Sequence, residues 1–560
     1  MHDDSNSRRS RWKIFNKINL NCQVIKNIKL HHVILLCIIL TSTFTHLWNV
    51  IEFPSFHSDE GVYIRRALYI LTGNGLHDPA SSFDHSQEST SSFDHPFFGQ
   101  IFLSGIFKLI GYPYSLNPSS ELQSIESLYL IPRLIMGILA VLDTFLIYKI
   151  SERQFNKKVA VASSILFAVM PATWFTRRIV LDSIMLPFIL TSIYLALKGN
   201  KIPISQYKIL CISAGILLGI AIFTKIPALS FIPIVGYFVY QNLSIIQKNT
   251  KLINKTKFLL LWFLIPVIII PCIWPIYSIV TENFDEFLNG VIWQGTDRHT
   301  AEKSLLNTAE SFFNADPVLV VFGTIGLIYS LLRKEISLII WVVPYLIFLY
   351  LIGWVSHFHF IPIIPVLCIS ISKFIYDLSR IKLFRNYHPQ IFFSITIMIA
   401  LLGFLTTVLL ISTDVSSAQL SAISYIAKEV ELHRQHSAFS ETKNKIDAEN
   451  NNLTVIASPI SSWIYKYVFK NDNAFSHIRD TKPIKTSHIL LLVDNAYKNI
   501  ISNQDENMTQ IDRLIRIYDN TTKVAEFNID VSDYNRKNYP YSGINSAVIG
   551  SRSHEIRTNY

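Results

Sequence analysis

Apolar runs long enough to cross a lipid bilayer recur along most of this chain, and they restrict its fold more than any other feature. The first covers residues 30–50, and about 20 residues at a helical rise of about 1.5 Å each match the thickness of a bilayer core. Inside a bilayer every backbone polar group needs an internal partner, so such runs are expected to be helical. We expect spans at residues 30–50, 130–150, 159–175, 183–197, 209–224, 226–241, 258–280, 317–332, 336–353, 360–377 and 390–412. The sequence therefore predicts a mainly α, polytopic membrane protein with a bundle of about 11 transmembrane helices.

Composition supports this class. Half of the residues are hydrophobic and 16% are charged, whereas a soluble domain carries roughly 25% charged residues. The net charge of +10 would suit a nucleic-acid partner, but the basic residues lie in the connections between apolar runs. That placement follows the positive-inside rule instead, so we expect membrane lipid and no nucleic acid around this protein.

The connections between the spans alternate in character, and this predicts their sidedness. One set is short and basic, and it contains Arg153, Lys157, Lys158, Lys198, Lys201, Lys208, Lys248, Lys251, Lys255, Lys257, Arg333, Lys334, Arg380, Lys382 and Arg385. With the basic residues 1–29 inside as a retained cytoplasmic tail, all of these loops fall on the cytoplasmic side. A cleaved signal peptide is the alternative, but the first apolar run is long and lacks a small-residue cleavage site. We therefore expect a cell-membrane protein with three outward features, residues 51–129, 281–316 and 413–560.

These outward features differ from one another. The tail 413–560 is rich in Asn, Lys, Asp and Ser, and it contains two short apolar runs, 453–457 and 488–493, that are typical of buried strands. Stretches 419–430 and 510–517 are helical in pattern. The sequence thus predicts a transmembrane domain over residues 30–412, followed by a small extracytoplasmic α/β domain.

Two stretches of the first outward loop are predicted to form helices that do not span the membrane. Residues 59–71 follow Ser58, a suitable N-cap, and begin with two acids. Their apolar side chains share one face, as in a helix that lies in the membrane interface. Residues 96–110 begin with a proline and form the second helix.

Carboxylates and arginines gather on the outward side. Asp59 and Glu60 follow the first span, and Asp182 lies between the third and fourth spans beside Arg177 and Arg178. Carboxylates at the mouth of a membrane bundle are costly to desolvate, so they are candidates for function. Arginine forks suit bidentate binding of phosphate. We interpret the five residues as lining one polar cavity; helix capping by the first two acids, and solvated arginines at the membrane edge, are the alternatives.

Further polar side chains lie at outward ends of spans. Lys225 ends the fifth span and either complements a phosphate or extends to the interface. His95 precedes a proline and marks either a helix start or a site. His357 and His359, flanked by Trp and Phe, fit an interfacial aromatic belt slightly better than a substrate role.

No metal site is predicted. The five cysteines lie in the N-terminal tail or in apolar runs, and no pair has metal-ligand spacing. The histidines and aspartates of residues 81–95 lie on a Ser-rich linker without the defined geometry that zinc requires. We expect no cofactor; a divalent metal is not indicated.

Taken together, the motifs resemble a known group of enzymes. They are similar to the protein O-mannosyltransferases (the dolichyl-phosphate-mannose-protein mannosyltransferase family) and the lipid A aminoarabinose transferases, which are membrane glycosyltransferases of the C superfamily (GT-C). The resemblance covers about residues 30–380 and rests on the order of Asp59-Glu60, His95-Pro96, Arg133 at the start of the second span, Arg177 to Asp182, Thr224-Lys225 and Pro362 to Pro365.

The resemblance implies an enzyme that transfers a sugar, mannose or another hexose, from a polyprenyl or dolichyl phosphate carrier to an acceptor outside the cytoplasm. Asp59, with Glu60, would act as the base or orient the acceptor, and Asp182 would shape the same cavity. The donor and its phosphate would be held by Arg177, Arg178, Lys225, His95, Arg133, His357 and His359. An inverting displacement needs a base on one face of the sugar, and a lipid phosphate leaves as a stable anion that cations stabilise.

The sequence also departs from the family pattern. Phe97 stands where a second proline is usual, and His357 and His359 stand where arginine or tyrosine is frequent. The acceptor, whether protein, lipid or glycan, therefore stays open. A transporter or flippase of lipid-linked saccharides is a more remote alternative, since transporters place ionisable groups near the midplane and contain internal repeats. A non-catalytic scaffold is another.

Overall fold

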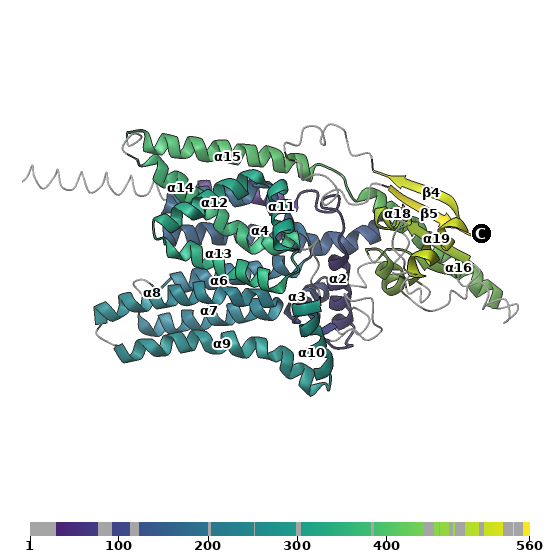
Figure 1. Ribbon diagram of the computed structural model, residues 1–560, viewed down its shortest axis with the longest axis horizontal. Coiled ribbons are helices and arrows are strands. Elements are labelled where there is room, and N and C mark those ends of the chain that lie inside the picture. Colours follow the sequence, from purple (N-terminus) through teal and green to yellow (C-terminus); the bar gives the residue numbers. More distant parts are fainter. Residues whose placement is uncertain are drawn as a thin grey trace, which may run out of the picture.

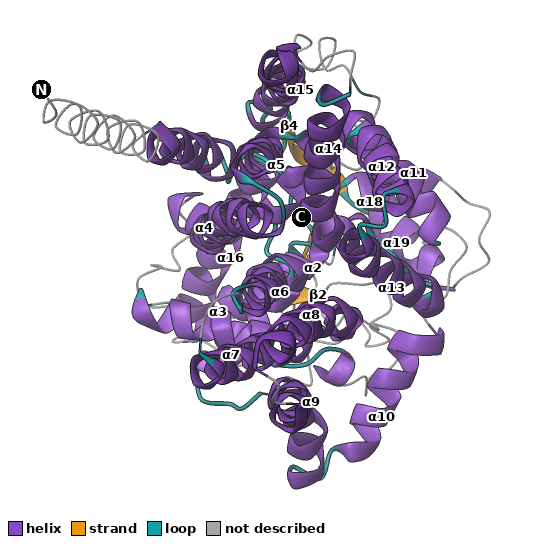
Figure 2. Cartoon of the chain, turned by 90° about the vertical axis from the view of Figure 1, so that its left-hand side faces the viewer, coloured by secondary structure: helices purple, strands orange, loops and turns teal. Residues whose placement is uncertain are grey.

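Helices dominate the computed structural model of the chain. It describes residues 30–76, 92–111, 122–199, 203–250, 253–297, 304–381, 386–441, 453–458, 460–469, 474–475, 488–502, 509–529, 541 and 553–560. Long helices lie side by side in a bundle, with shorter helices and a small sheet at one end (Figure 1). Seen along the bundle, the helices are viewed mostly end-on, and the strands lie behind them (Figure 2). The predicted basic tail 1–29 lies outside the described residues.

Seven helices of the described part are long and apolar enough to cross a membrane: Leu30–Leu47, Ile125–Gln154, Ile204–Thr224, Ile226–Leu243, Leu259–Val280, His357–Ser379 and His388–Ile411. Two bent pairs, Lys157–Val169 with Pro171–Arg177 and Leu305–Ala315 with Pro317–Leu332, raise the number to nine. Leu181–Leu197 and Ile336–Ile352 are apolar but shorter. The structure therefore confirms a multi-pass helical membrane protein, while the number of eleven spans stays a prediction.

The bundle consists of the first span and a series of numbered helices. These are α4 (Leu122–Gln154), α5 (Lys157–Val169), α6 (Leu181–Leu197), α7 (Ile204–Thr224), α8 (Ile232–Thr250), α9 (Ile253–Val280), α12 (Pro317–Leu332), α13 (Ile336–Ile352), α14 (Ile364–Ser379) and α15 (His388–Ile411). Short 3₁₀ segments η2 (Pro171–Arg177), η3 (Ile226–Phe231) and η6 (His357–Ile363) connect some of them. Prolines open or interrupt all three segments, because proline removes a backbone donor and favours the first turn of a new helix.

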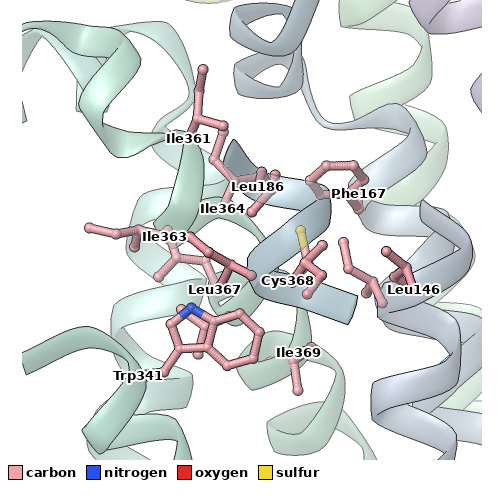
Figure 3. Close-up of a cluster of buried hydrophobic side chains, with 14 of the residues drawn as sticks. Leu146, Phe167, Leu186, Trp341, Ile361, Ile363, Ile364, Leu367, Cys368 and Ile369 are labelled. Atoms are coloured by element: carbon pink, nitrogen blue, oxygen red, sulfur yellow. The ribbon is translucent and has the colours of Figure 1, made fainter. Parts of the chain in front are cut away.

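Helix α14 lies at the centre of the bundle core. Its Leu367 and Cys368 pack among buried side chains from neighbouring helices, including Trp341 of α13, Leu186 of α6 and Phe167 of α5 (Figure 3). By contrast, α9 and α15 leave large apolar side chains exposed. A helix that is apolar on its outer face requires lipid rather than water around it, which agrees with a membrane bundle.

The end of the bundle that faces the sheet carries the short helices. They are α2 (Ser58–Leu71), η1 (Ser92–Asp94), α3 (Phe98–Leu109), α10 (Phe284–Ile292), η4 (Trp293–Asp297) and α11 (Leu305–Ala315). Both helices predicted in the first outward loop are present. The N-cap of α2, however, is His57 and not Ser58, because His57 Nδ1 accepts the Asp59 amide at 3.3 Å. Glu60 Oε2 in return accepts the His57 amide at 3.0 Å, which completes a reciprocal cap.

A mixed five-stranded sheet follows the bundle. Its strands are β1 (Leu453–Ile456), β2 (Ala474–Phe475), β3 (His488–Val493), β4 (Thr522–Asn528) and β5 (Ser553–Thr558), in the order β2-β1-β3-β5-β4. β1 is parallel to β2 and β3, and β5 is antiparallel to β3 and β4. The helices α16 (Ser417–Glu441), α18 (Asn495–Ser502) and α19 (Thr509–Asp519) and the π-helical turn Ile464–Val468 accompany it. The predicted strands and helices of this region are present.

The two faces of the sheet are buried differently. Because side chains alternate along a strand, Val455 of β1 and Leu490 of β3 point into one cluster, which also contains Tyr63 of α2 and side chains of α16. Ile456 and Leu491 belong to a second, smaller cluster. One face of the sheet is thus packed against α16 and against α2, the short helix that carries the acid pair.

Candidate active site

The first turn of α2 separates the acid pair into two environments. Successive residues of a helix point about 100° apart, and Asp59 and Glu60 accordingly differ in exposure, with 8% and 0% of their surfaces accessible. Asp59 lies at the edge of the structure's interior, whereas Glu60 is enclosed. The sequence treats the two acids as a pair, but the fold gives them different surroundings.

Glu60 is held by a network of donors. Arg133 Nε donates to Oε1 at 3.0 Å and Arg133 Nη2 to Oε2 at 2.8 Å. The Ile179 amide donates to Oε1 at 3.1 Å, and Arg178 Nη1 lies 3.8 Å from Oε2. Burial alone would raise the pKa of Glu60, but the charge and hydrogen bonds of Arg133, with Arg178 and the Ile179 amide, bring the pKa below its ordinary value. Glu60 is therefore an ionised, fully bonded carboxylate.

Arg133 uses all five of its N–H groups within the protein. Besides its bonds to Glu60, Nη1 donates to the carbonyls of Val50 and Pro54 at 2.9 and 2.7 Å. Nη2 also donates to the carbonyl of Ser55 at 3.3 Å. A guanidinium has five donors, so this side chain ties the segment after the first span to α2.

The two arginines of η2 and its C-cap are enclosed as well. Arg178 Nη1 donates to the Ser55 carbonyl at 2.7 Å, and its guanidinium lies 5.2 Å from the Trp174 ring centre. Arg177 donates through Nη2 to the carbonyl of Trp48, while its Nε and Nη1 have no hydrogen-bond partner among the described residues. Neither guanidinium is more than 1% exposed, so the interpretation of solvated arginines at a membrane edge does not describe this structure.

Asp182 and Lys225 form a second buried ion pair. Lys225 Nζ lies 2.6 Å from Asp182 Oδ2, and within the described part of the chain the other carboxylate oxygen, Oδ1, has no hydrogen-bond partner. Asp182 lies in the first turn of α6, where the helix dipole favours a negative charge. Lys225 is the extended residue after α7, and its Nζ lies 5.0 Å from the Phe358 ring centre. Asp182, at the start of α6, and Lys225, at the end of α7, thus meet.

A third ion pair was not predicted from the sequence. Arg66 of α2 donates to both oxygens of Asp94 in η1, at 2.8 and 3.1 Å, and both residues are buried. His95 follows directly, with Nδ1 2.6 Å from the Asp94 carbonyl and 3.3 Å from the Gln294 amide of η4. The pairing fixes the segment before α3 against α2. Its only signal in the sequence is that a basic and an acidic residue occur on two separate segments.

Tyr63 lies among the carboxylates of these networks. Burial raises the pKa of its phenol well above the ordinary value, and the neighbouring charges of Asp59, Asp94 and Asp182 raise it further. Its ring lies 6.4 Å from that of His95. From the sequence, Tyr63 is expected only on the apolar face of this helix. In the structure, Tyr63 lies one turn of α2 after Asp59 and so on the same side as that carboxylate.

The two histidines of the ninth-to-tenth connection take different positions. His359 Nδ1 accepts the Ser356 amide at 3.0 Å and caps η6. His357 packs with its ring 5.0 Å from Phe175 and 6.3 Å from the ring of His57, next to the acid pair. His357 therefore lies beside α2, and His359 supports a turn.

Asp59 stands out among the acids of this region. Its Oδ1 accepts the Ser58 hydroxyl at 3.3 Å and lies 3.5 Å from His57 Nδ1. Within the described residues no Lys or Arg nitrogen lies in ion-pair range of its carboxylate, whereas Glu60, Asp94 and Asp182 each have one. The described part of the chain holds no group of three or more metal-ligating side chains.

Comparisons with known proteins bear on the fold and on the class of enzyme. The family model described as dolichyl-phosphate-mannose-protein mannosyltransferase matches residues 81–282. The archaeal oligosaccharyltransferase AglB from Archaeoglobus fulgidus, solved with an inhibitory peptide and a dolichol-phosphate, superposes with a TM-score of 0.51 at 13% identity, over 90% of this chain and 74% of AglB. The chain therefore shares the fold of this oligosaccharyltransferase.

Other glycosyltransferase structures are similar to a lesser degree. ArnT from Cupriavidus metallidurans, bound to undecaprenyl phosphate, gives a TM-score of 0.47 at 11% identity, over 94% of this chain and 98% of ArnT. The Pmt1-Pmt2 complex of S. cerevisiae, bound to its sugar donor, gives 0.34 at 18% identity, over 46% of this chain and 34% of that one. No curated protein sequence matches this chain. The superposition on AglB confirms the predicted fold, the partial family match agrees with the predicted enzyme class, and the roles of the residues stay predictions.

Proposed function

We propose that this glycosyltransferase transfers a sugar, mannose or another hexose, from a polyprenyl or dolichyl phosphate to an acceptor on the outer side of the membrane, with inversion at the anomeric carbon. The family match to mannosyltransferases supports the donor class, as do the dolichol-phosphate on AglB and the undecaprenyl phosphate on ArnT. The peptide bound to AglB supports a protein acceptor. A lipid or glycan acceptor is the alternative.

The observation that carries the proposal is the state of Asp59. A general base needs a lone pair that is not already committed to a cation. Among the described residues, the Asp59 carboxylate accepts the Ser58 hydroxyl and lies 3.5 Å from His57 Nδ1, and Asp59 is the more exposed member of its pair. We assign Asp59 the task of orienting the acceptor hydroxyl and accepting its proton.

The other site residues divide into two groups. Glu60 and Arg133 hold the turn that carries Asp59, because their bonds are complete within the protein. Lys225, with Asp182 as its counter-ion, and the arginines 177 and 178 supply the positive charge that a leaving lipid phosphate requires. Ser58, His57 and His357 border the acceptor side.

The test compares an amide with a carboxylate at one position. Asp59→Asn should lower the rate of sugar transfer from a radiolabelled polyprenyl phosphate donor by about 100- to 10,000-fold, the usual contribution of a general base, while donor binding persists. Asp285→Asn is the matched control, since Asp285 is an exposed acid in the first turn of another short helix, α10. Equal rates for the wild type and Asp59→Asn would refute the assignment and move attention to Asp182.

A further inference from the structure

The segment after β1 reaches from the sheet to the helix that carries the acid pair. Trp463 immediately precedes the π-helical turn Ile464–Val468 and is 5% exposed. Its Nε1 donates to the Ile460 carbonyl at 3.1 Å, which fixes the plane of the indole. The indole lies against Gly61 of α2, the second residue after Asp59. A side chain from the C-terminal domain thus contacts the first turns of the site helix.

The contact leaves no room for a side chain at position 61. A Cβ there would lie 2.2 Å from Trp463 Nε1, 2.7 Å from Cδ1 and 2.8 Å from Cε2. These atoms belong to a rigid ring with a fixed hydrogen bond, so they cannot move aside as the end of a flexible chain does. Glycine is unfavourable inside a helix, and its presence in α2 is accounted for by this approach of the indole.

Trp463 has a second contact, with Tyr129, which packs next to the residue that holds Glu60. Its ring lies 6.2 Å from that of Tyr129 on α4, edge to face, and the Tyr129 ring lies 4.0 Å from Phe56. The guanidinium of Arg133 lies 4.7 Å from the centre of the Phe56 ring. Arg133 is the residue that bonds both oxygens of Glu60. The indole therefore borders the first turn of α2 on one side and its support on the other.

We infer that Trp463 is a positioning residue for the transfer reaction: the C-terminal domain inserts this indole between Gly61 and Tyr129 and so holds the Asp59 turn in its reactive position. The inference rests on the proposed role of Asp59. It gives the C-terminal domain a part in assembling the active site, in addition to any contact with the acceptor. Trp463 itself does not touch the reacting atoms.

The first test adds a methyl group at position 61, where the indole lies against α2. Gly61→Ala should displace the indole or the helix and lower kcat for sugar transfer by about 100-fold, since a displacement of about 1 Å at a catalytic group has an effect of that size, with the donor KM little changed. Gly105→Ala is the matched control, because a Cβ at Gly105 of α3 meets nothing within 4 Å. In a Trp463→Ala background, which lowers kcat by itself, Gly61→Ala should cost nothing further.

A second readout is independent of catalysis. Hydrogen–deuterium exchange at the amides of residues 57–62 should be faster in Trp463→Ala than in the wild type. It should be unchanged in Trp262→Ala, which removes a partly exposed tryptophan from α9. If the wild type transfers no sugar from any polyprenyl phosphate, the proposed function fails, and the exchange measurement still decides whether the indole holds the Asp59 turn in place.

Three results would overturn the inference. The first is a Gly61→Ala variant as active as Gly105→Ala. The second is a Gly61→Ala variant that loses the same factor in the presence and absence of the indole. The third is unchanged exchange at residues 57–62 in Trp463→Ala. Faster exchange together with loss of the Gly61→Ala effect in the Trp463→Ala background establishes the positioning role.

Discussion

Glu60 and Arg133 form a two-pronged ion pair, with 3.0 Å between Nε and Oε1 and 2.8 Å between Nη2 and Oε2, and neither side chain is exposed to solvent. Taking both charges out of water is costly, and the pair is tolerated because every donor and acceptor has a partner. The consequence for the neighbouring residue is more important than the stability of the pair itself. The first turn of α2 is anchored through Glu60, so Asp59 next to it is held in place although no Lys or Arg of the described residues pairs with it.

Loss of one member of this pair should be strongly destabilising. Arg133→Ala leaves a carboxylate buried without its cation, which typically costs about 3–5 kcal/mol. Denaturant titration of the purified protein in detergent measures this. Lys149→Ala is the control, because the Lys149–Glu152 pair is 30% and 25% exposed, and such pairs contribute about 0–1 kcal/mol. Equal stability of the two variants would contradict the assigned role of the buried pair.

Variants of the Asp182–Lys225 pair distinguish a structural role of Lys225 from a role in binding the donor. Lys225→Met should weaken binding of a polyprenyl phosphate by about 10- to 100-fold, as expected for one charge-assisted hydrogen bond of about 1.5–3 kcal/mol. Adding Asp182→Asn removes the stranded charge, so the double variant should regain stability without regaining affinity. Calorimetry with the donor lipid and thermal unfolding measure the two quantities. Recovery of affinity in the double variant would show that Lys225 serves only its carboxylate.

Local patterns in the sequence predicted the elements that depend on local physics. The helix predicted at residues 59–71 is observed as Ser58–Leu71, and the strand predicted at 488–493 is observed as His488–Val493. Apolar periodicity, first-turn acids and a short apolar run are sufficient for such elements. The strands β4 and β5 were not predicted, because the alternation in Thr522–Asn528 is weak and that strand is mostly exposed.

The partners within the site were predictable only in part. Sidedness predicts Asp59, Asp182 and Lys225 at one end of the bundle, but nothing in the sequence indicates that Arg66 pairs with Asp94 or that Gly61 contacts Trp463. These contacts join segments separated by 28 to 402 positions, and no periodicity records them. These contacts depend on how the helices and the sheet pack against one another, so only the structure reveals them.

Asp316 provides a test of how the bundle supports η2. It caps α12 by accepting the Leu319 amide on Oδ1 at 2.9 Å, and its Oδ2 accepts the Ala172 amide of η2 at 3.1 Å. Asp316→Ala should lower the free energy of unfolding by about 1–2 kcal/mol through loss of the cap alone. Asp316→Asn should lower it less, because the carboxamide oxygen can still accept one backbone amide. Ser304→Ala, which removes the cap of α11 at a more exposed position, is the comparison. Equal losses for Asp316→Ala and Ser304→Ala would argue against the link to η2.

The C-terminal domain should lose stability in mild acid because of His554 in β5. This side chain is 2% exposed, and burial, assisted by the charge of Lys498, lowers its pKa from 6.5 to about 4. Between those two values the unfolded chain binds a proton that the folded chain does not, so the free energy of unfolding falls as the pH falls through this window.

His554→Asn removes the titrating group and should flatten the pH dependence, whereas His32→Asn, at an exposed position of the first span, should leave it unchanged. Hydrogen–deuterium exchange at the β5 amides of the full chain, compared at pH 7 and pH 4.5 after correction for the intrinsic rate, measures the effect in place. Because β5 lies next to β3 in the sheet, and the sheet packs on α16 and α2, the same change should weaken the support of the Asp59 turn. A wild-type protein whose corrected exchange is the same at both pH values would refute the role of His554.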